Sequence, residues 1–136
     1  MLFMILFVSS IGFSCKKESD HSCPAPTYPI SGLWIGTYTV TQVPAQGSLY
    51  YSFIIKPDGK LLTEGLGGNG ITYYGTGTWV LNGSAFTYTV TSLTTGVKQT
   101  GSLTYSNSGT LTSGTWQDIN NSPNLNGTFP SMLRVN

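Results

Sequence analysis

The segment Ser31-Gly32-Leu33-Trp34, with the stretch that follows it to Gln42, decides the fold. It places a glycine just ahead of an aromatic residue, and the same spacing of small residue and ring recurs further along the chain. The recurrences are Thr76-Gly77-Thr78-Trp79, Ser113-Gly114-Thr115-Trp116 and Asn126-Gly127-Thr128-Phe129. Glycine lets two backbones approach closely, and the ring after it fills the space that this crowding leaves. The pattern predicts one closed sheet built on inward-facing aromatic side chains.

Composition favours a single all-β domain and argues against several classes of function. Only 8% of the 136 residues are charged, the net charge is +1, and 12% of the residues are aromatic. Glycine and threonine are abundant, and no helical period of useful length appears. A nucleic-acid surface needs a basic stripe and a calcium site needs clustered carboxylates. We therefore expect no nucleic-acid partner, no metal and no other cofactor.

The N-terminal residues 1–14 are expected to be a signal peptide. Met1 to Phe13 is almost wholly apolar but too short to span a bilayer as a helix, which takes about 20 residues. Gly12-Phe13-Ser14-Cys15 ends this run, and Lys16-Lys17-Glu18 follows at once. This edge resembles the lipobox of bacterial lipoproteins, in which the signal is cut before the cysteine and the cysteine is acylated. The alternatives are an ordinary signal peptide cut elsewhere and a buried hydrophobic strand.

The lipobox resemblance implies that Cys15 is lipidated and binds the protein to a lipid bilayer of the cell envelope, at the outer membrane with a periplasmic or surface-exposed domain. Several acyl chains on one residue meet the requirement of more than one lipid for stable anchoring. Residues 15–30 would then be a flexible tether. His21 and Cys23 lie in this tether and are interpreted as linker residues, because a reactive Cys-His pair needs rigid support.

Eight strands are expected from Ser31 onward. Most are rich in Thr, Tyr, Val and Ile, and their residue types alternate with a period of two, as in a strand whose successive side chains point to opposite faces. Their expected ranges are 33–42, 49–56, 60–66, 71–81, 85–93, 97–105, 110–117 and 125–135. Three connections contain Asp58-Gly59, Asn82-Gly83 or Ser108-Gly109 and are predicted to be tight turns, and most of the others are longer.

The alternation of tight and longer connections predicts an up-and-down order, since every second connection then lies at the same end of the sheet. Closure into an eight-stranded antiparallel β-barrel would hide the edge strands. Such a barrel has an interior that is either filled by side chains or able to hold one small ligand.

Residue parity along each strand sorts the side chains into an inner and an outer face. Tyr50 and Tyr74 are expected outside. The residues expected inside are Trp34, Gly36, Tyr38, Val40, Tyr51, Phe53, Ile55, Tyr73, Gly75, Gly77, Trp79, Phe86, Tyr88, Val90, Gln99, Gly101, Leu103, Tyr105, Thr112, Gly114 and Trp116.

Strand direction sorts the inward residues by depth. A group of apolar side chains is expected to plug the end with the tight turns: Trp34, Ile55, Trp79, Phe86 and Leu103. A second group, with polar tips, is expected near the longer loops: Tyr38, Tyr51, Tyr73, Tyr88, Gln99 and Trp116. Rings with a polar edge and one amide would suit a small, partly apolar ligand. The alternative is that these side chains fill a narrow barrel and bond one another.

Residues 31–136 resemble the lipocalin and avidin (calycin) superfamily, and bacterial lipocalin-like lipoproteins in particular. The resemblance rests on Gly32-Leu33-Trp34 in the first strand, on the single arginine Arg134 late in the last strand, and on the run from Phe53 to Gly59. It implies that Arg134 packs over Trp34 and closes the barrel, a task that suits a stacking guanidinium. The alternative is a solvated charge near a frayed C-terminus.

No enzyme is expected. The one histidine lies in the tether, and the acids of the domain are Asp58 in a turn, Glu64 on a strand and Asp118 in a loop. Glu64 is interpreted as outward-facing, although an inward carboxylate beside tyrosines could recognise a ligand.

Three functions remain open. The leading hypothesis is a monomeric, membrane-anchored barrel that binds a small, partly apolar ligand. The alternative is an inhibitor or interaction module that contacts a protein or glycan through loops 43–48 and 118–124. A surface protein without any ligand is the third hypothesis.

Overall fold

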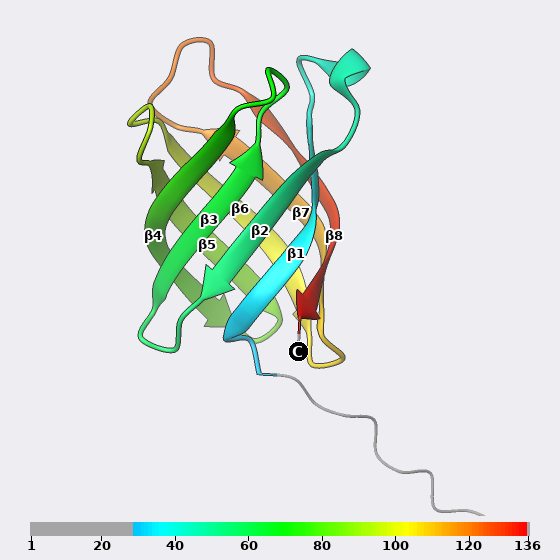
Figure 1. The fold of residues 1–136 in the computed structure, drawn as a ribbon. Coiled ribbons are helices and arrows are strands. Elements are labelled where there is room, and N and C mark those ends of the chain that lie inside the picture. Colours follow the sequence, from blue (N-terminus) through cyan, green and yellow to red (C-terminus); the bar gives the residue numbers. More distant parts are fainter. Residues whose placement is uncertain (1–28, 136) are drawn as a thin grey trace, which may run out of the picture.

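The computed structural model describes residues 29–135, which form a closed barrel of antiparallel strands in up-and-down order (Figure 1). The strands are β1 (Gly32–Val40), β2 (Leu49–Ile55), β3 (Lys60–Leu66), β4 (Thr72–Asn82), β5 (Ala85–Ser92), β6 (Lys98–Ser106), β7 (Thr110–Asp118) and β8 (Asn126–Val135). Each strand pairs with its neighbours in sequence, and β8 closes on β1. The predicted eight-stranded barrel is confirmed, and the strand ends lie within two residues of the predicted ones. Cys15, His21 and Cys23 lie outside the described residues.

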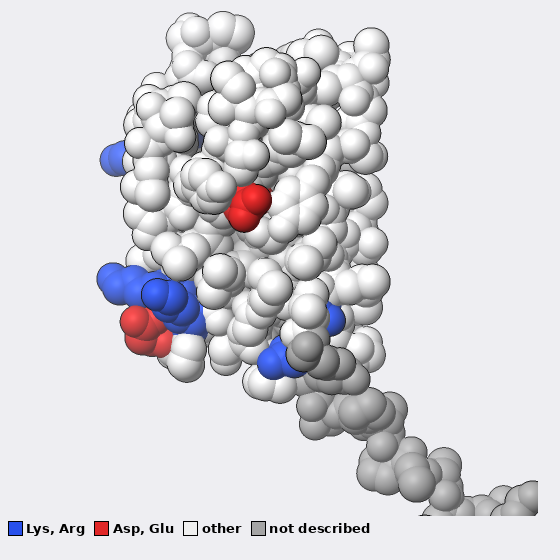
Figure 2. Space-filling view, viewed as in Figure 1, with Lys and Arg blue, Asp and Glu red and all other residues white. Residues whose placement is uncertain are grey.

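The two ends of the barrel differ in their connections (Figure 1). The tight turns β2–β3, β4–β5 and β6–β7 lie at one end, called here the closed end, and the chain both enters β1 and leaves β8 there. The other four connections lie at the opposite, open end, and the β1–β2 loop carries a short 3₁₀ helix, η1 (Pro44–Gln46). Figure 2 shows that most charged side chains on the viewed face gather toward the closed end.

Apolar side chains fill the half of the barrel nearest the closed end. Trp34, Phe53 and Phe86 are fully buried, and the half-buried Trp79 stacks on Phe86 with ring centroids 6.1 Å apart. The indole N–H groups donate to backbone carbonyls, Trp34 to Ile30 (2.7 Å) and Trp79 to the residue before the β2–β3 turn (2.9 Å). A buried ring with its polar edge satisfied is stable core, so the predicted plug is confirmed.

Glycines and rings alternate around the open half of the barrel. Paired residues on successive strands read Gly36, Tyr51, Gly65 and Tyr73 over β1–β4, and Tyr88, Gly101, Trp116 and Gly127 over β5–β8. A Cβ atom added at Gly65 would lie 2.7 Å from the Tyr51 ring, and one at Gly101 would lie 2.6 Å from the Tyr88 ring. The rings of Tyr51 and Tyr88 therefore lean over a glycine of the adjacent strand, and not over a glycine two places back in their own strand.

One predicted face is wrong. The β6–β7 register shifts between Ser102 and Thr104, and Ser113 on β7 has a left-handed backbone with φ of 54°. This bulge inserts a residue and reverses the parity before it. Leu111, which is fully buried, faces the core in place of Thr112.

The β1–β8 seam brings Trp34 and Arg134 together as paired residues. The Arg134 guanidinium donates to the carbonyl of Ser31 (3.2 Å) and covers Gly32, where an added Cβ would lie 3.0 Å from Nη2. The arginine thus holds the entry of the chain against the last strand.

Candidate ligand-binding site

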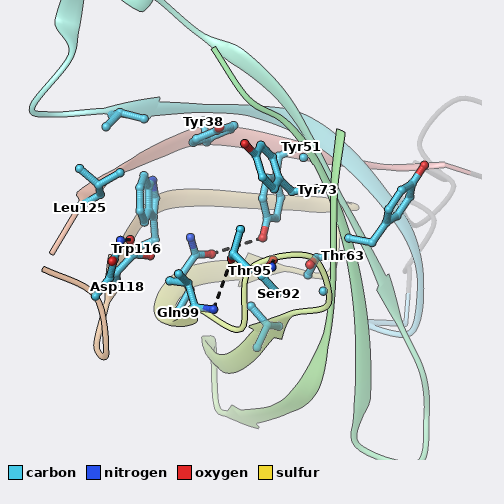
Figure 3. A pocket seen from close by; sticks show the side chains of 17 residues that line it. Tyr38, Tyr51, Thr63, Tyr73, Ser92, Thr95, Gln99, Trp116, Asp118 and Leu125 are labelled. Atoms are coloured by element: carbon cyan, nitrogen blue, oxygen red, sulfur yellow. Dashed lines mark hydrogen bonds between the residues drawn. The ribbon is translucent and has the colours of Figure 1, made fainter. Parts of the chain in front are cut away.

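A cavity of about 330 Å³ lies inside the barrel at the open end (Figure 3). Strands β1 to β7 all contribute to its wall, together with residues of the β5–β6 and β7–β8 loops. Six side chains with polar tips were predicted near the longer loops, and five of them line this cavity: Tyr38, Tyr51, Tyr73, Gln99 and Trp116. Tyr88, the sixth, is buried beneath them and reaches the site through a hydrogen bond to Gln99. Figure 3 shows the three tyrosines on one side and Gln99, Trp116 and Asp118 on another.

Aromatic rings make the apolar part of the wall. Tyr38 packs edge-on against Tyr51 and Trp116, with ring centroids 5.5 and 5.8 Å apart, and Phe129 lies below Tyr51 at 5.2 Å. The polar edges of these rings are used by the barrel itself. The Tyr38 hydroxyl donates to the carbonyl of Leu66 (2.9 Å), and the Trp116 indole donates to that of Thr39 (3.1 Å). The rings are therefore held in place and can offer apolar surface to a guest.

Gln99 is held by two phenols. Its Oε1 accepts hydrogen bonds from the hydroxyls of Tyr51 (3.3 Å) and Tyr88 (2.9 Å). Burial raises the pKa of both tyrosines well above the ordinary value, so both phenols remain donors at neutral pH. With Oε1 occupied in this way, the amide nitrogen lies on the side of Trp116 and Asp118 (Figure 3). The site therefore offers one oriented N–H donor group.

Asp118 is the functional candidate that sequence reasoning missed. It was assigned to a loop, but it is the last residue of β7, pairs with Gln99 across the sheet, and lines the cavity with only 7% of its surface exposed. Burial raises the pKa of this carboxyl, against hydrogen bonds from the Asn121 side chain and the Leu125 backbone that lower it. The parity of Gly114 and Trp116 could have revealed it, because Asp118 continues the same inward face.

The other strand acid, Glu64, lies on the outer face of β3, as expected. It alternates with the buried Thr63 and Gly65 and borders an outer groove with Ile54 and Tyr74. The inward carboxylate of this barrel is thus contributed by β7 and not by β3.

Within residues 29–135, no group of three or more His, Cys, Asp or Glu side chains is placed to hold a metal ion. The same residues contain no helix with the length and apolar character needed to cross a membrane. Neither a scan against protein-family models nor a search of curated proteins found a match for this chain.

Proposed function

We propose that this protein is a lipocalin-like lipoprotein of the cell envelope whose barrel binds a small, partly apolar molecule at its open end. The observation that carries the proposal is the cavity of about 330 Å³, walled by braced aromatic rings and supplied with one oriented amide and one carboxyl. Small-molecule sites typically combine a mostly apolar concave wall with a few placed polar groups, and their volumes begin at roughly 300 Å³. We propose no catalytic step for this site.

The cavity favours this proposal over the loop-based interaction module. An interior filled by its own side chains would leave the open-end loops as the natural binding surface. Here Tyr51 and Tyr88 lean over glycines of the adjacent strands, and a cavity of about 330 Å³ remains at the open end.

The direction of the barrel fits an anchor at Cys15. The described chain enters β1 at the closed end, opposite the cavity (Figure 1). A tether attached there would direct the cavity mouth away from the bilayer. The ligand would then enter from the aqueous side.

Native mass spectrometry of the full-length protein, isolated gently from its own host, tests the proposal. We expect a retained small molecule on the wild-type chain. Val90→Trp should abolish the retained mass, because Val90 lines the cavity and its side chain is 4% exposed. Val80→Trp is the matched control, since Val80 is 62% exposed on the outer face of β4. A bare wild-type spectrum, or retention unchanged in a folded Val90→Trp chain, would contradict the proposal.

A further inference from the structure

We infer that the cavity selects ligands with an amine head group, held at Asp118, over ligands of similar shape that end in a carboxylate. This inference rests on the proposed function and names the chemical class of the ligand. It starts from the one acidic side chain among the residues that line the cavity.

Among the residues that the structure describes, no cationic side chain partners the buried carboxyl of Asp118. No lysine, arginine or histidine of residues 29–135 lines the cavity. The hydrogen bonds given to the carboxyl come from neutral groups, the Asn121 amide at 3.5 Å and the Leu125 backbone. A carboxylate removed from water is costly unless a charge or strong donor compensates for it. An ammonium group of a ligand would supply that compensation at the place where the protein does not.

The rest of the wall favours the same head group. Tyrosine and tryptophan rings attract cations to their faces, and the rings of Tyr38 and Trp116 line the same cavity as the carboxyl. Gln99, on the rung opposite Asp118, turns its amide nitrogen to this side and can hold a hydroxyl or carbonyl next to the amine. The aromatic rings of the wall that lie farther from Asp118 would contact a short aromatic or aliphatic body of the ligand.

The same site is unfavourable for a ligand with a carboxylate head group. It would place a second negative charge near Asp118, and like charges at close range raise each other's free energy. The indole of Trp116 and the hydroxyl of Tyr38 already donate to backbone carbonyls, so they are engaged as donors. Fatty-acid-like ligands are therefore disfavoured by charge, although their chains match the apolar wall.

Three probes with nearly the same body separate the head groups: 2-phenylethylamine, 2-phenylethanol and 3-phenylpropionate. Calorimetric titration of the full-length protein in zwitterionic lipid nanodiscs measures the affinities, with empty nanodiscs as the blank. We expect the amine to bind about tenfold or more tightly than the alcohol, as a charge-assisted hydrogen bond allows, and the carboxylate to bind most weakly.

Two variants assign the preference to Asp118. Asp118→Asn keeps the shape of the side chain and should bring the amine-to-alcohol ratio close to one. Glu64→Gln removes the acid of the outer face and should leave the ratio unchanged. Equal affinity for the three probes, or an amine preference that survives Asp118→Asn, would overturn the inference while cavity binding stands. Failure of all three probes on the wild-type chain would count against both the inference and the proposed function.

Discussion

Asp118 illustrates, at the scale of the residue, how a proposed ligand contact can oppose stability. The residue is 7% exposed, and burial raises the pKa of its carboxyl, which means that the folded chain disfavours the ionised form. The titratable groups that face it from β2 and β5 are the phenols of Tyr51 and Tyr88, which contribute no positive charge. A residue kept at such a cost is more readily understood as a ligand contact than as a support of the fold.

The first prediction is that Asp118→Asn raises the melting temperature of the ligand-free protein by a few degrees at pH 7. The folded-state pKa of Asp118 is raised above its unfolded value of about 3.9. The wild-type chain therefore loses stability relative to the variant as the pH rises through these two pKa values, and the two chains converge below about pH 3. Calorimetric scans from pH 3 to pH 8 measure the difference.

Glu64→Gln is the control for this prediction, because it neutralises an acid on the outer face of the barrel. A melting temperature of Asp118→Asn at or below the wild-type value at pH 7, or a gap that widens toward low pH, would contradict the burial argument.

At the scale of the element, the arrangement of rings over glycines keeps the strands close while the cavity stays open. Tyr51 on β2 lies between Gly36 of β1 and Gly65 of β3, and its ring occupies the space that a Cβ atom at Gly65 would take. A side chain at such a glycine would have to displace the ring toward the cavity. The glycines of the wall are thus part of the site, although they present no chemistry of their own.

The second prediction is that Gly65→Ala destabilises the barrel by about 1–3 kcal/mol, as overpacking of a filled interior does. The new Cβ would lie 2.7 Å from the Tyr51 ring, so the ring must move and its hydrogen bond to Gln99 is disturbed. We also expect weaker binding of 2-phenylethylamine. Urea unfolding and calorimetric titration measure the two effects.

A double-mutant cycle with Tyr51→Leu identifies the cause. The cost of Gly65→Ala should shrink in the Tyr51→Leu background, because the ring that the methyl group meets is then absent. Equal costs in both backgrounds would assign the effect to the backbone of β3 instead.

The strands were predictable from sequence because the residues that form the turns between them are a local signal. Asp58-Gly59 and Asn82-Gly83 supply the positive φ values of the tight turns, and the alternation between them places most of the inner face. Parity fails where the chain departs from a regular pleat. The left-handed Ser113 makes Leu111 the inward residue, and no feature of the local composition marks that bulge.

The position of Asp118 was missed for a different reason. The polar run of residues 119–124 follows it, and a carboxyl beside such a run is ordinarily a loop residue exposed to water. Its burial depends on the long-range pairing of β7 with β6 and on the approach of Leu125. Most of the aromatic side chains that line the cavity, by contrast, were predictable from strand direction and residue parity alone.

At the scale of the whole molecule, the proposed recognition and the proposed attachment fall at opposite ends of the barrel. The described chain begins and ends at the closed end, and the cavity lies at the open end (Figure 1). Lys56, Asp58 and Lys60 lie in or beside the β2–β3 turn at the closed end, and the lining of the cavity contains one charged residue.

The third prediction concerns the anchor. Cys15→Ser should release the protein from the membrane fraction of its host and remove the mass of the diacylglyceryl group, because one thiol carries the first lipid. Fractionation and intact-mass spectrometry are the measurements. Cys23→Ser, the matched control, should leave both the fraction and the mass of the lipid unchanged, and a lipid lost with Cys23 instead would refute the lipobox assignment.

Both ends of the described chain lie at the closed end, and this placement affects how closely many copies could stand on one surface. Barrels that all stand on the same end can be packed shoulder to shoulder across a surface without any copy obstructing the mouth of the next. In such a layer, binding capacity would rise in proportion to the number of copies, and exchange of the guest with the surrounding fluid would depend little on lateral density.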